Sequence, residues 1–524
     1  MGQRCSCSRP KKARLPDVDG TNFRQYTFPF ENLVLEGGGA KGAAYVGALK
    51  ILEDAGILQN IKRFGGTSAG SITAGFLAVG MTPQDILDKM NQDLQKILLG
   101  GSPSPCCLCC YFNNLENHYG IFPAEKFLDW YGKAIEEHLQ KRRRQISGHE
   151  NPHKFDNLSG DITFAQVYHA LGKELCTVSY ETAFSSEVYS HVKTSPLLEI
   201  REAVRMSMSI PVVFEAYEPS VGLQPGVRHV DGGMSANYPI YCFEGWWLSM
   251  HPENTFAKRL GALNGRNLKK NFLPGVSREH FHSGGNEDRE KTLGACLFSD
   301  TGELDKFQHQ FEDRMEAFLV DFPQYKRILK KPNTKLANEY RQKMERLQVD
   351  RDKFLKKLDD DSRLEEKIMQ VAALYPNKAE MNRRFDTLFS APEIIQIYGE
   401  PDKDAAFEML FLNYNKEPVE PTKSVAVGIY QNQKHLQKAK NECLKGSFAD
   451  TSVEFYGQLM EFIRKNKPME EYDVGRSIGI NVDYIGSLDF DLETGDKEFL
   501  MTQGAVATKA FLHDWVRKHV HPPV

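Results

Sequence analysis

One serine stands in a sequence context that favours nucleophilic chemistry. Ser68 is the central residue of the pentad Gly66-Thr67-Ser68-Ala69-Gly70. In a G-x-S-x-G nucleophile elbow, the flanking glycines leave room for a strained turn that exposes the serine oxygen at the end of a strand. With 41 glycines among 524 residues, about 0.2 such pentads are expected by chance. The pentad is therefore weak evidence until its surroundings are considered.

A glycine-rich turn upstream has the composition of an anion-binding turn. Its residues are Gly37, Gly38, Gly39, Ala40, Lys41 and Gly42. A tetrahedral oxyanion requires preorganised N–H donors about 3 Å away, and glycines let backbone amides approach without interfering Cβ atoms. We expect the oxyanion donors in this turn, at the start of a helix whose dipole also favours an anion. A dinucleotide phosphate site is disfavoured, because the next strand ends in Phe64-Gly65-Gly66 without an acid to hold a ribose.

A serine nucleophile needs a base, and the sequence offers an aspartate. Asp231 precedes Gly232 and Gly233 at the expected end of a strand, and the two glycines permit close approach to another turn. The order serine, acid, histidine of α/β-hydrolases fits poorly, because Ser68 comes on only the second strand. An aspartate, with an ordinary pKa of about 3.9, becomes a base at neutral pH when a dry pocket raises that pKa. We expect Asp231 to be the base and His229 to be an ordinary strand residue.

Alternating strands and helices must position these residues. We expect strands over residues 32–35 and 61–64, each running into a glycine-rich turn and then a helix of small residues. Thr82 and Asp85 predict the capped start of a further helix over residues 83–99. This alternation predicts an α/β fold with parallel strand pairing.

Three motifs together resemble those of the patatin-like phospholipases. They are the glycine-rich turn at residues 37–42, the pentad at residues 66–70 and the Asp-Gly-Gly triplet at residues 231–233. The resemblance is strong over residues 32–259 and loose over residues 477–513. It implies a patatin-like three-layer sandwich with a mainly parallel central sheet.

The resemblance also implies roles for individual residues. That family uses a serine–aspartate dyad without a histidine, so Ser68 is implied to be the acyl-enzyme nucleophile and Asp231 the proton acceptor. Gly38 and Gly39 are implied to be the oxyanion donors, while Glu36 stands where the family often has Asp or Gly. The implied activity is phospholipase A-type hydrolysis of fatty-acid esters of membrane phospholipids. No metal or other cofactor is implied, and no metal-ligand spacing accompanies the motifs.

The chain divides into four expected segments. They are a basic N-terminal tail over residues 1–29, a catalytic core over residues 30–285, a large, mostly helical insertion over residues 286–473, and a strand and helix over residues 474–524 that complete the core. In the insertion we expect a helical hairpin whose turn lies at residues 359–362. At the C-terminal end we expect strands over residues 477–482 and 488–492 before the closing helix.

The N-terminal tail predicts attachment to a membrane surface. Gly2 fits the N-myristoylation pattern, and Cys5 and Cys7 are candidate palmitoylation sites within a basic stretch. A single lipid chain binds only marginally, but the second thioester-linked chain and the basic patch supply further signals. We therefore expect a peripheral, lipid-anchored protein on the cytoplasmic face of membranes, with some in the cytosol. A disordered basic tail without lipid is the alternative.

Composition narrows the class of partners. The 66 Lys and Arg against 70 Asp and Glu give a net charge of −4, so nucleic acid is not an expected ligand. The expected partners are the phospholipid substrate and the membrane surface, and the need for a protein activator is left open. A neutral-lipid lipase or transacylase, or a lipid-anchored scaffold whose insertion binds a partner, remain alternatives. The cysteine cluster at residues 106–110 is expected to pack as small apolar side chains or to contact a membrane.

Overall fold

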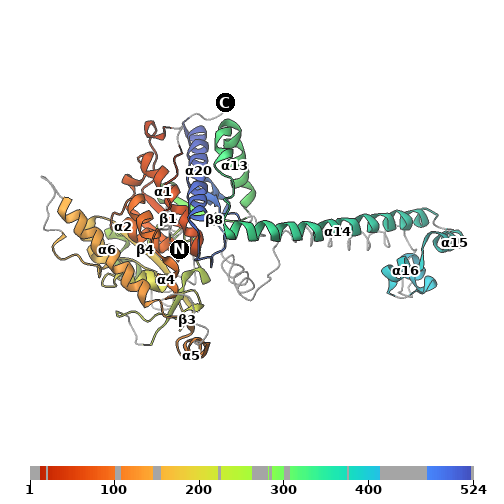
Figure 1. Cartoon of the computed structure of the whole chain (residues 1–524), viewed down its shortest axis with the longest axis horizontal. Helices are drawn as coiled ribbons and strands as arrows, with labels where there is room; N and C mark the ends of the chain where they lie inside the picture. Colours follow the sequence, from red (N-terminus) through yellow and green to blue (C-terminus); the bar gives the residue numbers. More distant parts are fainter. Residues whose placement is uncertain are drawn as a thin grey trace, which may run out of the picture. The chain divides into compact units, whose positions relative to one another are not determined.

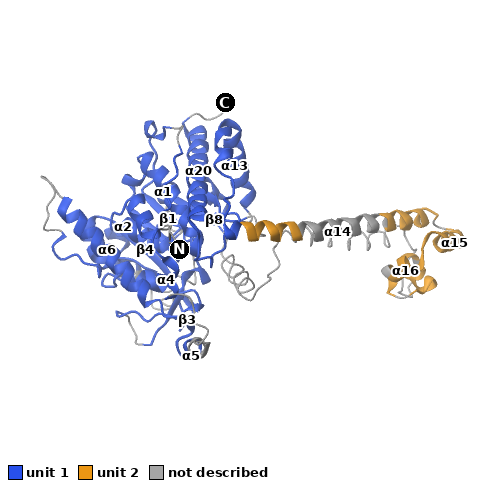
Figure 2. Ribbon diagram, in the orientation of Figure 1, with its two compact units in different colours: residues 1–337, 448–524 blue, residues 338–447 orange. Residues whose placement is uncertain are grey.

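The chain forms two compact units. The computed structural model describes residues 12–18, 22–100, 108–145, 155–183, 185–221, 226–261, 281, 286–299, 307–374, 377–399, 401–412 and 469–520. Unit 1 comprises residues 1–337 and 448–524, and unit 2 comprises residues 338–447 (Figure 2). Gly2, Cys5 and Cys7, on which the predicted lipidation depends, lie outside the described residues.

A seven-stranded, mainly parallel sheet forms the centre of unit 1, as predicted. Its strands are β1 (Asn32–Leu35), β2 (Arg63–Thr67), β4 (Glu174–Glu181), β5 (Ser186–Ser190), β7 (His229–Asp231), β8 (Thr292–Phe298) and β9 (Ser477–Asn481). The order is β5-β4-β2-β1-β8-β9, with β7 also paired to β4. Only β5 and β7 run antiparallel to their neighbour. Two further strands, β3 (Gly120–Phe122) and β6 (Val212–Phe214), form a separate parallel pair.

Unit 1 also contains the helices of the α/β core (Figure 1). They are α1 (Ala44–Asp54), α2 (Ala69–Ala78), α3 (Pro83–Met90), α4 (Leu94–Leu99), α5 (Leu108–His118), α6 (Glu125–Gln145), α7 (Phe164–Leu171), α8 (Ile200–Ser207), α9 (Phe256–Gly261), α12 (Asn286–Glu290), α13 (Gln308–Asp321) and α20 (Thr494–His519). The result is the predicted α/β fold. Among the helices in the described parts of the chain, none has the length and apolar character needed to cross a membrane.

Two glycines let α1 approach α20 closely. A Cβ atom on Gly47 would lie 1.7 Å from the carbonyl oxygen of Met501, and one on Gly504 would lie 2.0 Å from that of Ala44. Any side chain at these positions would force the helices apart. The helix that ends the chain is therefore part of the same core as the helix that follows β1, which agrees with the predicted completion of the core by the C-terminal segment.

Several predicted boundaries differ from the structure. The expected helix over residues 83–99 is two helices, because Asp93 accepts a hydrogen bond from the N–H of Lys96 and begins α4 separately. Residues 488–492 form a loop and not a strand. The insertion predicted from residue 286 includes β8, a core strand buried at every position, and the second unit begins only at residue 338.

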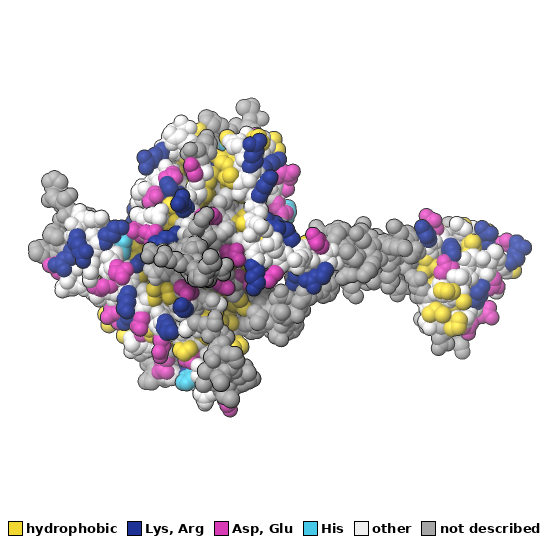
Figure 3. All heavy atoms as spheres, in the orientation of Figure 1, with side chains coloured by type: hydrophobic (Ala, Val, Ile, Leu, Met, Phe, Trp, Pro, Cys, Tyr) yellow, Lys and Arg dark blue, Asp and Glu magenta, His cyan; other side chains and the backbone are white. Residues whose placement is uncertain are grey.

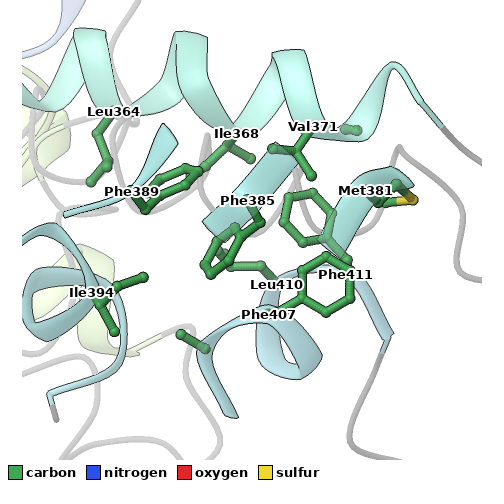
Figure 4. Close-up of a cluster of buried hydrophobic side chains, with 12 residues drawn as sticks. Leu364, Ile368, Val371, Met381, Phe385, Phe389, Ile394, Phe407, Leu410 and Phe411 are labelled. Atoms are coloured by element: carbon green, nitrogen blue, oxygen red, sulfur yellow. The ribbon is translucent and has the colours of Figure 1, made fainter. Parts of the chain in front are cut away.

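Unit 2 is helical and has its own apolar core. Its described elements are most of α14 (Lys335–Ala372), then α15 (Lys378–Leu388), α16 (Ala391–Tyr398), α17 (Lys403–Phe407) and a π-helical turn (Glu408–Leu412). Buried side chains from all of these helices form one cluster, in which Phe385 packs against the rings of Phe389, Phe407 and Phe411 (Figure 4).

The predicted hairpin turn at residues 359–362 is wrong. α14 continues without interruption through these residues. Its sequence contains no Gly or Pro, and an Asp in a helix interior costs only a few tenths of a kcal/mol (about 0.5) relative to better helix formers. Three consecutive aspartates are therefore insufficient to end a long helix.

Charged side chains of both signs are interspersed on the surface in Figure 3. This agrees with the near balance of acidic and basic residues in the sequence. Cys176, Cys242 and Cys296 are buried and form no disulfide with one another. Cys109 and Cys110 lie on α5, whereas Cys106 and Cys107 fall outside the described residues.

Candidate active site

Ser68 occupies a strained turn between β2 and α2. Its backbone has φ 53° and ψ −124°, a combination that costs a non-glycine residue about 1–3 kcal/mol. The glycines on either side are required sterically. A Cβ atom on Gly66 would lie 2.5 Å from the carbonyl carbon of Gly70, and one on Gly70 would lie 2.2 Å from the oxygen of Leu35. The pentad therefore has the geometry of a nucleophile elbow, with Thr67 ending β2 and Ala69 beginning α2.

A second serine holds this turn in place. The N–H of Ser68 donates to Oγ of Ser207 at 2.9 Å, and Oγ of Ser207 donates to the carbonyl oxygen of Val178 at 2.6 Å. Ser207 is fully buried at the end of α8. Its hydroxyl thus connects the elbow to β4. This role could not be predicted from the sequence, because serine is common and no local pattern marks Ser207.

The strand β4 places Asp231 opposite the elbow. β5 and β7 both pair with the last residues of β4, so they must lie on opposite edges of that strand. β5 takes one edge, and β7 therefore lies on the other edge, next to β2. On that edge, Thr67 faces Val178 and Asp231 faces Ser179, the next residue of β4. One strand residue corresponds to about 3.3 Å. The ends of β2 and β7 therefore meet, and Ser68 and Asp231 come from neighbouring positions of the sheet.

Close packing around the Asp-Gly-Gly triplet agrees with this arrangement. A Cβ atom on Gly232 would lie 3.1 Å from Cγ2 of Thr67 and 2.2 Å from the carbonyl oxygen of Val178. Asp231 is buried, with 1% of its surface exposed. One of its carboxylate oxygens, Oδ1, accepts the N–H of Gly233 at 2.7 Å. These contacts fix the carboxylate beside the elbow.

His229 lies two residues before Asp231 on β7 and has a different environment. Its Nδ1 is 3.2 Å from Oγ of Ser179, the residue that pairs with Asp231. Burial lowers the pKa of His229 to about 4, so its imidazole is neutral at neutral pH. This is a packed strand histidine that hydrogen-bonds a neighbouring serine.

Some N–H groups of the glycine-rich turn are already hydrogen-bonded within the protein, which reduces the number of possible oxyanion donors. The N–H of Gly37 donates to the oxygen of Asn237, that of Ala40 to Ser487, and that of Lys41 to Gly38. Because these N–H groups are engaged within the protein, the prediction that they are donors is corrected. Gly42 lies inside the 3-10 helix η2 (Gly39–Ala43), where a Cβ atom would be 2.9 Å from that of Ala69, so it provides close packing.

Gly38 and Gly39 remain candidates for the oxyanion donors. Their N–H groups take part in none of the turn and loop hydrogen bonds formed by the described residues. Gly39 has φ +56°, and a Cβ atom there would lie 2.0 Å from the carbonyl oxygen of Ser487. Gly39 therefore cannot be replaced without moving the turn or the facing loop.

The side chain of Glu36 anchors the glycine-rich turn. Its two carboxylate oxygens accept hydrogen bonds from Nδ2 of Asn237 at 3.0 Å and from the N–H of Leu297 at 2.7 Å. Asn237 also donates to the carbonyl oxygen of Gly37 at 3.0 Å. A Cβ atom on Gly37 would lie 3.1 Å from that of Ser68, so this anchored turn directly contacts the elbow.

An apolar cavity opens beside Ser68. Gly39, Ala40 and Ser68 are among its lining residues, and the loop predicted as a strand at residues 488–492 contributes to the wall. Large apolar side chains form most of the remainder, including Phe76, Leu98, Phe127, Trp130, Phe214 and Phe490. A cavity of this character accommodates a hydrocarbon chain. Within the described part of the chain, no three His, Cys, Asp or Glu side chains lie together in a way that could hold a metal ion.

Comparison with known families agrees with this geometry. Residues 33–242 match the family model described as Patatin-like phospholipase, and this range includes Ser68 and Asp231. Over residues 33–242 the chain is therefore similar to the patatin-like phospholipases.

Two viral proteins and one solved structure are similar to the chain. Protein R571 of Acanthamoeba polyphaga mimivirus is 31% identical over 41% of this chain and 61% of its own length. The "probable lipid hydrolase 463L" of invertebrate iridescent virus 6 is 25% identical over 40% of this chain and 62% of its own length. The chain thus spans less than two thirds of either relative. The match to the crystal structure of VipD from Legionella pneumophila spans 97% of this chain and 72% of the VipD chain. Its sequence identity is 16%, and its TM-score is low, at 0.37.

Proposed function

We propose that this protein is a phospholipase A-type acyl hydrolase that uses Ser68 and Asp231 as a catalytic dyad. The observation that carries the proposal is the meeting of β2 and β7 on one edge of β4, which brings the serine elbow and the buried aspartate together. The adjacent apolar cavity supports a substrate with a long acyl chain. The matched family supports ester hydrolysis of a lipid.

The first half of the reaction forms an acyl-serine. Oγ of Ser68 attacks the ester carbonyl carbon while Asp231 accepts its proton. The carbonyl oxygen becomes an oxyanion, which accepts hydrogen bonds from the N–H groups of Gly38 and Gly39. The tetrahedral intermediate collapses as the carbon–oxygen bond to the alcohol breaks. Asp231 returns its proton to the departing alkoxide, so that a lysophospholipid leaves and the acyl chain stays on Ser68.

The second half releases the fatty acid. Asp231 accepts a proton from a water molecule, whose oxygen attacks the acyl-serine carbonyl carbon. The same glycine N–H groups stabilise the second oxyanion. Collapse of this intermediate breaks the bond to Oγ of Ser68, which recovers its proton from Asp231. The cycle returns the enzyme to its starting state and requires no cofactor in any of its steps.

Fatty-acid release from mixed phospholipid vesicles tests this proposal. We expect wild type to release fatty acid and lysophospholipid, and Ser68→Ala and Asp231→Asn each to lose about 10³-fold or more of that activity. Asp54→Asn, which removes an exposed carboxylate that pairs with Lys50, is the matched control and should keep full activity. Activity that survives in Ser68→Ala would contradict the proposal. Addition of glycerol acceptors and analysis of acylated products separates hydrolysis from the transacylase alternative.

We also propose that lipids on the N-terminal tail hold the enzyme at the cytoplasmic face of membranes. The support is the sequence pattern at Gly2 with the thiols of Cys5 and Cys7, because two acyl chains give stable attachment where one does not. Cell fractionation tests this. Gly2→Ala should move the protein from the membrane to the soluble fraction, and Cys5→Ser with Cys7→Ser should do so partly. Unchanged membrane association in Gly2→Ala would contradict it.

A further inference from the structure

A second pocket in unit 1 is polar and separate from the acyl cavity. It lies at the C-terminal end of α2, between the start of α3, the last turns of α6 and the approach to β4. The ten residues of α2 separate it from Ser68, a distance of about 15 Å at 1.5 Å per helical residue. Its polar side chains include Thr82, Asp85, His138, Lys141, Arg142 and Lys173.

Positive charge exceeds negative charge in this pocket. Among its lining residues, three cations, Lys141, Arg142 and Lys173, face one carboxylate, Asp85. That carboxylate is already bound by Lys141 at 2.8 Å. Arg142 and Lys173 donate hydrogen bonds to the backbone carbonyls of Val79 and Ile61, and neither pairs with an acid in the part of the chain that the structure describes.

The two cations without an acid repel one another. Burial lowers the pKa of Lys173, and the nearby charges of Arg142 and Lys62 lower it further. Both side chains are partly buried, so solvent screens this repulsion incompletely. An anion placed between them would relieve it.

A buried histidine in the same pocket has an unused polar atom. His138 is 7% exposed, and its Nε2 makes no hydrogen bond with any residue that the structure describes. Its Nδ1 lies 3.8 Å from Oδ2 of Asp85. Burial lowers the pKa of His138 to about 4. The charges of Arg142 and Lys141 add to this shift, whereas Asp85 and a hydrogen bond with the backbone of Gly80 oppose it. An anion acceptor at Nε2 would supply the missing partner and favour the protonated ring.

We propose that this pocket binds a phosphate group through Arg142, Lys173 and Nε2 of His138. Phosphate carries up to two negative charges and several acceptor oxygens, which match two cations and a ring N–H. The group could belong to a soluble phosphate compound or to a phosphate-monoester lipid headgroup, since both present the same chemistry. The site does not depend on the proposed reaction, because it lies at the opposite end of α2 from Ser68.

Titration of the full chain with inorganic phosphate, followed by isothermal calorimetry at constant ionic strength, tests the site. We expect saturable binding that becomes about tenfold weaker in Arg142→Gln and in Lys173→Gln, because each removes one charge-assisted contact. Arg144→Gln is the matched control. It makes the same charge change in the same last turn of α6, but Arg144 lies on the exposed surface outside the pocket. Its phosphate affinity should differ from that of wild type by less than about twofold. Absence of saturable binding to wild type, or equal weakening in all three variants, would overturn the proposal.

A second readout follows the wild-type protein and uses one variant only to assign a signal. The imidazole signal of His138, assigned by its loss in His138→Gln, should titrate near pH 4 without phosphate and at least about one pH unit higher with saturating phosphate. An unchanged titration would overturn the proposal. Flotation with vesicles of phosphatidylcholine alone or with added phosphatidic acid then distinguishes the sources. Recruitment by phosphatidic acid that Lys173→Gln abolishes identifies a lipid headgroup, and phosphate binding without recruitment identifies a soluble ligand. Fluorophosphonate labelling of Ser68 should be equal in all these proteins, which separates this site from the catalytic proposal.

Discussion

Replacement of Ser207 by alanine should disable the elbow without touching the nucleophile. The change removes the acceptor of the Ser68 N–H and the donor to the Val178 carbonyl, both in the buried core. An unsatisfied buried donor costs about 1–3 kcal/mol and a lost hydrogen bond about 1 kcal/mol, so we expect the free energy of unfolding to fall by about 2–4 kcal/mol. The strained backbone of Ser68 should then relax, and displacement of its Oγ should slow reaction with a fluorophosphonate by about 10²-fold.

The assay combines urea denaturation with the rate of fluorophosphonate labelling under conditions where both proteins are folded. Thr508→Val is the control, since it removes another buried hydroxyl, which donates to the Gly504 carbonyl at 2.8 Å within α20. It should lower stability slightly and leave the labelling rate unchanged. Labelling of Ser207→Ala at the wild-type rate, or equal slowing in both variants, would refute the role of Ser207 in positioning Ser68.

Three further predictions concern other parts of the molecule. Gly39→Ala should slow fluorophosphonate labelling of Ser68 about tenfold or more, because the added Cβ atom would lie 2.0 Å from a backbone oxygen of the facing loop. Gly56 also has a positive φ, but a Cβ atom there would meet nothing within 4 Å, so Gly56→Ala should leave the labelling rate unchanged. Phe385→Ala should destabilise unit 2 by about 3–5 kcal/mol, measured as lost hydrogen-exchange protection there, while protection of the central sheet persists. Burial lowers the pKa of His138 and of His229 from 6.5 to about 4, so the folded state binds fewer protons than the unfolded state. The free energy of unfolding should therefore fall, by about 3 kcal/mol for each histidine, as the pH drops from about 6.5 to about 4, and His229→Gln should flatten that fall in urea titrations.

Local signals were sufficient to predict the elements that carry the chemistry. The strand at residues 32–35 and the capping box of Thr82 and Asp85 are present as expected. Each depends on residues a few positions apart, where propensity and capping act directly. The elbow was predictable for the same reason, since its two glycines lie within one short pentad and permit the close backbone contacts that a Cβ atom would block.

Features that depend on contacts between distant residues could not be predicted in this way. The hydrogen bond between Ser68 and Ser207 joins residues 139 positions apart, and the engagement of the Gly37 and Ala40 N–H groups depends on loops from elsewhere in the chain. One error was avoidable. The apolar run of β8, Thr292–Phe298, has the composition of a buried strand and could have placed the start of the second unit later in the chain.

Intact-protein mass spectrometry after reaction with a fluorophosphonate tests the central claim most directly. We predict a single covalent adduct on wild type, located on the peptide that contains Ser68, no adduct on Ser68→Ala, and strongly slowed formation on Asp231→Asn. The last result is expected because the proton of Oγ then has no carboxylate to accept it. An adduct at another serine, or equal labelling of the wild type and Asp231→Asn, would contradict a dyad formed where β2 and β7 meet.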